Sequence, residues 1–554
     1  MTRFACASFL LLLPPATACG DDTGGDGAAE GSTSGGTEAG TDGDTGLDTS
    51  GTEGADAESG STDADGSTGD EPGPAVTEVD CWTTGFTDAG AECVRVAVPV
   101  DADDPSRGEL EIGVAYLPAT GDGSGLPVVA LVGGPGPSGS LEAAGLFLDG
   151  GPLVASRAEH DVYLIDYRAV GLSEPAIGCA PFGSPREVTP CADAITDAGL
   201  ELSDITSAHF AADIDAILEG FDVPQVVVWG GSYGTRLGMT LMRDYPGRVA
   251  GAVLDGVFPI EINGFTQGDE AIAAQLAFVA DRCETEPGCS EALGDVRAQI
   301  EAFVAEREPG LVDDFIAQVS RLNRHGAAPL LVSTLAIATD EDAQALLNTL
   351  AGYDYTELSD ADYGSPIRDD IAERAESLPM TMAIVCSEEA AFIDVQPSEV
   401  AQFGWSEQVV AAFEGQQGGA PFPPAFATMV CDAFGAPATP DLEIEPVLSD
   451  IPTLIISAGQ DVQTPVHWAD AVAEGLDNVT HHVVPMGQHV ASVGNGCARD
   501  MVAAFFDAPT EPVDGSCLEQ YPTELVLDSE DLAQTFAPTS ALGLPVRPAA
   551  RRTW

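Results

Sequence analysis

The chain has 554 residues, of which 90 are acidic and 20 are basic, and its formal net charge at pH 7 is −70. A surface with this charge repels a phosphate backbone, so a nucleic-acid ligand is excluded. Every basic residue is an arginine, which removes lysine as a catalytic base or Schiff-base residue.

Residues 1–18 have the pattern of a secretory signal peptide. Arg3 precedes an apolar run that is too short to span a bilayer, and small residues end the run just before Cys19. The ending Ala-Thr-Ala-Cys resembles a bacterial lipobox, in which the cysteine is lipidated and becomes the new N-terminus. We therefore expect an exported protein with a lipid anchor on Cys19 at a bacterial membrane surface. Periplasmic or secreted release without a lipid is the alternative.

Residues 19–78 are predicted to form a disordered tether. Between residues 20 and 75 there are 15 acidic residues and no basic residue, and Leu47 is the only large apolar side chain. Such a segment cannot bury enough surface to offset the entropy lost on ordering. Calcium binding is the alternative reading of the acidic residues, but their spacing is not that of an EF-hand.

Ten cysteines remain when Cys6 and Cys19 are set aside. An even number of cysteines in an exported protein predicts disulfides. Pairing between neighbours closes the shortest loops, and the expected bonds are Cys81–Cys93, Cys179–Cys191, Cys283–Cys289, Cys386–Cys431 and Cys497–Cys517. No close cluster of cysteine and histidine has the spacing of metal ligands, and we expect neither a metal nor a cofactor.

Apolar strand-like runs alternate with helical stretches over residues 79–260 and again over 441–540. The expected strands are 92–100, 108–119, 127–134, 160–168, 225–231, 249–257, 451–461 and 478–486. This alternation indicates an α/β fold with a mostly parallel sheet covered by helices on both faces. Residues 261–440 are helical and are predicted to be a lid inserted over the carboxyl edge of the sheet, where ligands bind in such folds. Residues 541–554 are a C-terminal tail.

The sequence Gly230-Gly231-Ser232-Tyr233-Gly234 matches the pattern G-x-S-x-G, with an expected strand before it and a helix after it. A nucleophile elbow requires this context, because the sharp turn lifts the serine out of the sheet. An ordinary glycine-rich connection is the alternative. We predict that Ser232 is a nucleophile.

A serine hydroxyl needs a base to accept its proton, and in this architecture an acid and then a histidine follow the serine. His489 lies in a loop just past a strand end, whereas His481 and His482 lie inside the strand. The expected base is therefore His489.

The acid is expected in the loop after the preceding strand. The segment LIISAGQDVQTP places Asp461 there, with Asp470 and Asp477 as more distant competitors. Its role is to hold the imidazole tautomer and to stabilise the imidazolium.

Acyl transfer also needs donors for the developing oxyanion. The backbone N–H of Tyr233 is one expected donor. The second is expected from GGPGPSG at 133–139, where Gly134 is preferred and Gly133 is the neighbouring alternative. A phosphate-binding loop does not fit, since lysine and the P-loop spacing are both lacking.

Six segments follow one another in the order found in proline iminopeptidases and secreted tripeptidyl aminopeptidases of the α/β-hydrolase fold. They are GGPGPSG, DYRAVGLSEP, WGGSYGTRLG, LDGV, GQDVQTP and GQH. The chain resembles this family over roughly residues 80–540, and its cysteines near 283–289 and after His489 resemble the tripeptidyl branch. Two residues depart from the family pattern, Val132 before Gly-Gly-Pro-Gly and Ala169 in the second segment. We expect Asp166 and Arg168 of that segment to be structural.

The resemblance implies an exported serine aminopeptidase that releases N-terminal residues or short peptides through an acyl-enzyme intermediate. Such an enzyme needs an anion to hold the ammonium group of a peptide with a free N-terminus, and the resemblance places an acidic residue after Cys386. The candidates are Glu388, which is preferred, and Glu389. Two other functions stay open: an esterase or other small-molecule hydrolase of the same fold, and a catalytically inactive, surface-anchored binding protein.

Overall fold

The computed structural model describes most of the chain between residues 74 and 520. The described residues are 74–82, 84–148, 151–179, 188–264, 267–322, 343–344, 347, 372–392, 400–413, 424–440 and 444–520. The predicted signal peptide, Cys19, nearly all of the predicted tether and the C-terminal tail lie outside them.

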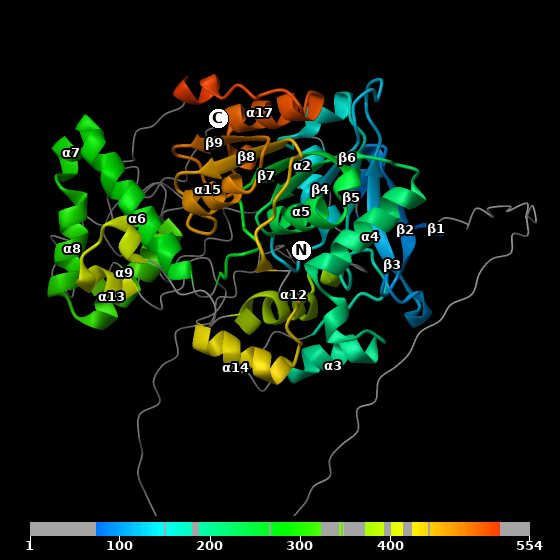
Figure 1. Ribbon diagram of the computed structural model, residues 1–554, viewed down its shortest axis with the longest axis horizontal. Helices are drawn as coiled ribbons and strands as arrows, with labels where there is room; N and C mark the ends of the chain where they lie inside the picture. The colour runs from blue at the N-terminus through cyan, green and yellow to red at the C-terminus, as the bar shows by residue number, and fades with distance from the viewer. Residues whose placement is uncertain are drawn as a thin grey trace, which may run out of the picture. The chain divides into compact units, whose positions relative to one another are not determined.

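A nine-stranded sheet forms the centre of the described part (Figure 1). Its strand order is β1-β2-β3-β5-β4-β6-β7-β8-β9. The strands are β1 Val76–Glu78, β2 Glu92–Pro99, β3 Glu109–Leu117, β4 Val128–Leu131, β5 Val162–Ile165, β6 Val226–Gly231, β7 Val249–Asp255, β8 Thr453–Ala458 and β9 Val479–Val484. Pairing is antiparallel from β1 to β5 and parallel from β5 to β9. The predicted fold class, a mostly parallel α/β sheet, is confirmed.

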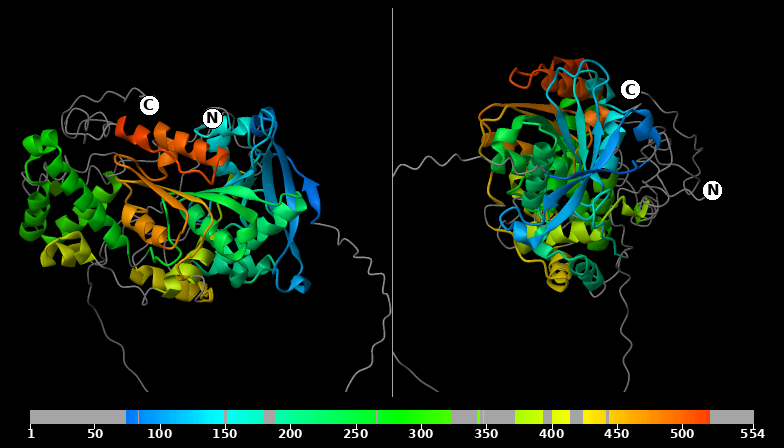
Figure 2. Two further views of the ribbon diagram at one scale, coloured as in Figure 1. Left: turned by 45° about the horizontal axis from the view of Figure 1, so that its top comes forward. Right: turned by 90° about the vertical axis from the view of Figure 1, so that its right-hand side faces the viewer.

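Helices cover both faces of the sheet, and Figure 2 shows α17 on one side with α4 and α5 on the other. The helices of this part are α1 Thr84–Asp88, α2 Gly139–Phe147, α3 Thr189–Asp197, α4 Ser207–Gly220, α5 Tyr233–Asp244, α15 Val466–Glu474, α16 Ala491–Gly494 and α17 Gly496–Asp507. Strands β4, β6 and β8 are buried along their whole length. Continuous apolar runs are typical of parallel strands that are covered on both sides.

The start of the ordered fold differs from the prediction. Strand β1 pairs antiparallel with β2, although its residues fall inside the predicted tether 19–78. The predicted end of the tether is therefore too late. The three residues of β1 are all exposed, so they lack the apolar alternation that would have revealed a strand.

The chain between β7 and β8 forms two groups of helices. The first group has an apolar core of its own, which includes Ile300, Phe315 and Phe413. It contains α6 Gly268–Thr285, α7 Pro287–Leu293, α8 Val296–Glu306, α9 Pro309–Leu322 and α13 Glu407–Phe413.

The second group packs into the main core instead. It contains α12 Leu378–Ile384, the π-helical turn η9 Val385–Glu389 and α14 Pro424–Phe434. Buried side chains such as Met380 and Val430 join the same cluster as the strands. Figure 1 shows α12 and α14 close to α3, apart from the first group. The predicted single lid is thus two structural units with different cores.

The structure forms all five predicted disulfides, Cys81–Cys93, Cys179–Cys191, Cys283–Cys289, Cys386–Cys431 and Cys497–Cys517. The Cys386–Cys431 bond joins η9 to α14 within the second group. Among the described residues, no helix combines the length and the apolarity that crossing a membrane requires.

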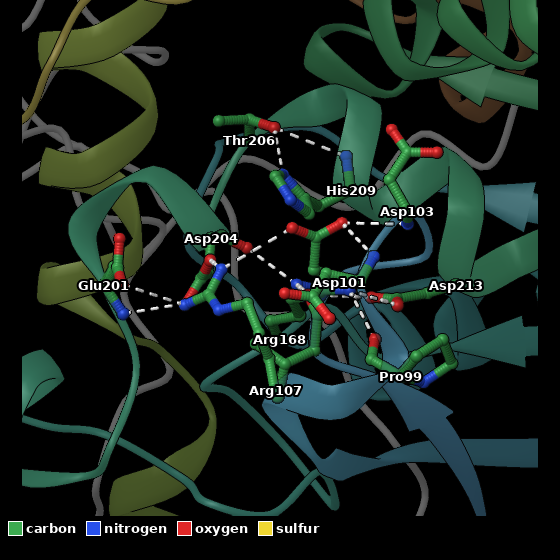
Figure 3. A network of polar contacts seen from close by, with 12 residues as sticks. Pro99, Asp101, Asp103, Arg107, Arg168, Glu201, Asp204, Thr206, His209 and Asp213 are labelled. Atoms are coloured by element: carbon green, nitrogen blue, oxygen red, sulfur yellow. Dashed lines mark hydrogen bonds and ion pairs between the residues drawn. The ribbon is translucent and has the colours of Figure 1, made fainter.

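Arg168 is a structural residue, as expected. Its side chain is 1% exposed and binds both carboxylate oxygens of Asp213 on α4 at 2.7 Å. Its other donors reach the backbone carbonyls of Pro99, Val100 and Asp204 (Figure 3). These bonds fix α4 against the sheet.

Asp166 is structural as well. Its buried carboxylate accepts hydrogen bonds from Ser138 Oγ at 2.5 Å, from Ser140 N at 2.9 Å and from Leu172 N at 2.7 Å. It therefore joins the end of β5 to the start of α2.

Candidate active site

Ser232 occupies a sharp turn between β6 and α5. Its φ of 56° and ψ of −125° are unusual for a residue other than glycine, and a nucleophile elbow imposes this kind of strain. A Cβ on Gly230 would lie 2.5 Å from the carbonyl oxygen of Gly234, and a Cβ on Gly234 would collide with the carbonyl oxygen of Leu131. The two glycines of the motif are thus required by the close passage of the backbone.

His489 and Asp461 form a hydrogen-bonded pair, with Nδ1 of His489 2.7 Å from Oδ2 of Asp461. Asp461 is 1% exposed, and its carboxylate also accepts bonds from Gln463 N at 2.8 Å, from Thr464 N at 3.0 Å and from Thr464 Oγ1 at 2.6 Å. Burial alone would raise the pKa of Asp461, but His489 and these donors together hold the pKa below its usual value.

A charged Asp461 favours the imidazole tautomer that carries its proton on Nδ1. This tautomer leaves Nε2 of His489 free to accept a proton. Asp470, one of the two alternative acids, lies 3.3 Å from Nδ1 of His481. Nδ1 of His489 bonds to Asp461, and not to Asp470 or Asp477.

The loop of His489 lies against the turn of Ser232. The backbone N–H of Ser232 donates to the carbonyl oxygen of Asp255 at 3.1 Å. Beside it, a Cβ on Gly256 would lie 3.3 Å from Nδ1 of His489, and a Cβ on Gly231 would lie 3.3 Å from Cγ1 of Val490. The loop that carries His489 and Val490 therefore lies beside the turn of Ser232, at the ends of β6 and β7.

The glycine loop 133–139 passes directly over Ser232. A Cβ on Gly133 would lie 2.7 Å from Cβ and 3.1 Å from Oγ of Ser232, so only glycine fits there. Gly134 has a φ of 115°. Tyr233 is the first residue of α5, and a helix leaves its first N–H groups without an internal partner. The structure thus brings both predicted donor segments to Ser232.

The second helix group of the insertion holds this loop in place. Ser138 N donates to the carbonyl oxygen of Ala375 at 2.7 Å, and Ser377 N donates to that of Gly136 at 2.9 Å. Thr381 Oγ1 donates to the carbonyl oxygen of Pro135 at 2.9 Å. Sequence reasoning missed these contacts, because they join residues more than two hundred positions apart and no local pattern marks them.

Glu388 is occupied by internal partners. Its carboxylate accepts hydrogen bonds from Ser207 N at 2.5 Å and from Ser207 Oγ at 2.8 Å, and it lies 3.5 Å from Nε of Arg236. Ser207 is the first residue of α4, where a negative charge is favourable. Glu388 therefore fixes a helix start, which does not fit the preference for this residue as the amine ligand.

Glu389 is better placed to hold a cation. It is 7% exposed, and burial, helped by the charge of Glu388, raises its pKa to about 7, although Arg236 acts in the opposite direction. Its Oε2 lies close to Gly264, which packs on the ring of Phe258. A bound ammonium group would offset the cost of burying this charge.

Hydrogen bonds join the turn of Ser232 to Phe258, which packs near Glu389. Thr235 Oγ1 donates to the carbonyl oxygen of Ser232 at 2.6 Å, and Phe258 N donates to Thr235 Oγ1 at 2.8 Å. A Cβ on Gly264 would lie 3.5 Å from the ring of Phe258 and 3.0 Å from Oε2 of Glu389. Within the described part of the chain, no group of three or more histidine, cysteine or acidic side chains is arranged to hold a metal ion.

Two parts of the chain match known protein families. Residues 127–285 match the family described as "alpha/beta hydrolase fold", and residues 422–517 match the family described as "TAP-like protein". Together with the sheet order, these matches show that the chain has the α/β-hydrolase fold.

Curated proteins with similar sequences include peptidases. The "Serine protease Hip1" of Mycobacterium tuberculosis (strain ATCC 25618 / H37Rv) is 30% identical over 261 residues, which cover 42% of this chain and 48% of the relative. The "Proline iminopeptidase" of Neisseria gonorrhoeae is 31% identical over 151 residues, which cover 27% of this chain and 38% of the relative. The chain spans about half, or less, of the length of these curated relatives. The matches support the expected family, the serine peptidases of the α/β-hydrolase fold.

A solved structure, the proline iminopeptidase of Mycobacterium smegmatis, covers 75% of this chain and 98% of its own. It is 17% identical, with a TM-score of 0.35.

Proposed function

We propose that the chain is an exported serine aminopeptidase that releases N-terminal residues or short peptides from peptides with a free N-terminus. The observation that carries the proposal is the His489–Asp461 pair, at 2.7 Å, in a loop beside the strained turn of Ser232. The peptidase relatives support the same class of reaction.

Acylation begins when Ser232 Oγ attacks the carbonyl carbon of the scissile peptide bond. His489 Nε2 takes the hydroxyl proton, while Asp461 stabilises the imidazolium. The backbone N–H groups of Tyr233 and Gly134 donate to the oxyanion. When the C–N bond breaks, His489 returns the proton to the leaving amine, and the acyl group stays on Ser232 as an ester.

Deacylation repeats these roles with water. His489 takes a proton from the water molecule that attacks the ester carbonyl, and it then protonates Ser232 Oγ as the C–O bond breaks. Throughout, Glu389 holds the substrate ammonium group, so that the acyl part that leaves carries the free N-terminus. This charge selects substrates with an unblocked amine.

A substrate panel tests the proposal. Aminoacyl- and tripeptidyl-arylamides, each with a free and a blocked amino terminus, are compared with simple aryl esters. We expect cleavage of the free-amine arylamides and much slower cleavage of the blocked ones. Turnover of esters alone would instead favour a small-molecule hydrolase, and no turnover of any substrate would favour an inactive binding protein.

Export and anchoring through Cys19 are part of the proposal. Five disulfides are expected in an oxidising compartment rather than in a cytosol. Lipid on Cys19 predicts that the wild-type chain fractionates with bacterial membranes and that Cys19→Ser moves it to the soluble fraction. An unchanged distribution would contradict the anchor.

A further inference from the structure

Asp255, the last residue of β7, contacts both catalytic loops. It is fully buried, at 0% exposed. Its carbonyl oxygen accepts the N–H of Ser232 at 3.1 Å. Its Oδ1 accepts the N–H of Ala491 and its Oδ2 accepts the N–H of Ser492, both at 2.8 Å. One residue therefore joins the turn of the nucleophile to the segment that follows His489.

The segment that Asp255 holds is strained. Val490, between His489 and Ala491, has a φ of 55° and a ψ of 71°, which is the left-handed region. A β-branched residue avoids this region, because its side chain crowds the backbone. Such a conformation persists only where surrounding contacts impose it. The two hydrogen bonds from Ala491 and Ser492 to Asp255 come immediately after the strained residue.

The strain has a geometric consequence for the base. The left-handed residue Val490 lies between His489 and the first residue of α16, so its backbone angles set the direction in which the chain leaves His489. Cγ1 of Val490 lies close to Gly231, next to Ser232, while Gly256 leaves room beside Nδ1 of His489. A relaxation of Val490 to an extended conformation would therefore move His489 relative to the turn of Ser232.

Asp255 is not a second triad acid. Nδ1 of His489 is bonded to Asp461, and both oxygens of Asp255 face backbone donors instead. A buried carboxylate is costly to maintain, and burial raises the pKa of Asp255 to about 6. Hydrogen bonds to a charged acceptor are about twice as strong as neutral ones, so a carboxylate holds a strained backbone better than an amide can.

We propose that Asp255 is a positioning residue for acyl transfer, whose carboxylate holds Val490 in the left-handed conformation that directs His489 toward Ser232. The proposal rests on the proposed serine-hydrolase chemistry, but not on the choice between peptides and esters.

The primary test is Asp255→Asn, which keeps the size of the side chain. An asparagine accepts with only one of its two polar atoms, so its NH2 group faces a backbone N–H. Misplacement of the base by a fraction of an ångström to an ångström lowers rates by up to about 100-fold. We expect kcat and the rate of fluorophosphonate labelling to fall together by about 10- to 100-fold, with KM unchanged.

The matched variant is Val490→Gly, since glycine adopts the left-handed conformation without strain. Its own kcat and labelling rate are measured first, as the reference for the double variant. Combined with Asp255→Asn, it is expected to restore part of the lost kcat and labelling rate, because less strain then opposes the active geometry. A purely structural role for Asp255 predicts no such recovery.

Three results would overturn the proposal: a folded Asp255→Asn protein with wild-type kcat, a loss confined to KM, or a double variant no faster than Asp255→Asn. If Asp255→Asn alone does not fold, the double variant is compared with Val490→Gly, and a loss of kcat of about 100-fold or more, which would mean that relief of the strain recovers nothing, overturns the proposal. A wild-type chain that neither labels nor hydrolyses any substrate contradicts the proposed function itself, which separates the two failures.

Discussion

The sheet edge and the insertion contribute to the site through different kinds of contact. At the sheet edge, Ser232, Asp461 and His489 follow strand ends, and short turns set their positions. In the insertion, Glu389 depends on η9, which packs into the main core and is tied to α14 by the Cys386–Cys431 disulfide. Local turns therefore position the proposed catalytic residues. Packing between segments far apart in the chain positions Glu389, the proposed contact for the substrate ammonium group.

The two helix groups of the insertion differ in the apolar core that each one packs into. The group around α6, α8 and α13 has its own core, whereas the group around α12 and η9 shares the core of the sheet. Only the second group contacts the glycine loop, through Ala375, Ser377 and Thr381, among the contacts that the structure describes. Glu389, the proposed contact for the substrate ammonium group, therefore lies in the helix group that shares the core of the sheet.

The largest effect is expected at the sheet edge, from Asp461→Asn. An asparagine favours the wrong tautomer of His489 and cannot stabilise the imidazolium, and a change of this kind lowers kcat by about 10⁴-fold in serine triads. The measurement is kcat with the best substrate of the panel.

The matched control is Asp470→Asn. Asp470 is 64% exposed and lies beside His481, so this variant is expected to keep wild-type kcat. Equal losses in Asp461→Asn and Asp470→Asn would contradict the distinct role of the sheet-edge carboxylate.

A smaller and more selective effect is expected in the insertion, from Glu389→Gln. Loss of the charge that holds the ammonium group is expected to lower kcat/KM about 10- to 100-fold on free-amine substrates, as for other hydrogen bonds to charged groups. Blocked substrates lack the ammonium group and should change little. The ratio of kcat/KM between free and blocked substrates is the measurement.

Glu388→Gln is the matched control, because it neutralises the neighbouring carboxylate. Glu388 bonds to Ser207 and lies 3.5 Å from Arg236, so its loss is expected to lower the melting temperature and to affect free and blocked substrates equally. A change in the free-to-blocked ratio in Glu388→Gln but not in Glu389→Gln would reverse the assignment.

The smallest effect is a pH dependence that belongs to Glu389 alone. Its pKa of about 7 means that the carboxylate gains a proton, and loses its charge, as the pH falls through this value. KM for free-amine substrates is therefore expected to rise as the pH falls from about 8 to about 6, relative to blocked substrates. The effect should vanish in Glu389→Gln; its persistence there would assign the titration to another group.

The sequence was informative where function depends on neighbouring residues. The motif around Ser232, the loop positions of Asp461 and His489, and the pairing of neighbouring cysteines follow from short patterns. The structure bonds His489 to Asp461 and forms the five disulfides. A chain-order rule also sufficed for the acid and the base.

It was uninformative where function depends on long-range contacts. The carboxylate of Asp255 bonds residues more than two hundred positions away, and Glu388 differs from Glu389 only through its contacts with Ser207 and Arg236. The two glutamates are the same residue type and are adjacent in the chain, so the sequence alone does not distinguish them. The roles proposed for them differ because Glu388 bonds to Ser207, whereas Oε2 of Glu389 lies close to Gly264.

The central claim, that Ser232 is the activated nucleophile, is tested most directly by labelling the wild-type protein with a fluorophosphonate and mapping the adduct by peptide mass spectrometry. The account predicts a single adduct on the peptide that contains Ser232, absent from Ser232→Ala and slowed in Asp461→Asn. An adduct on another residue, or a folded wild-type protein that does not react, would contradict the account.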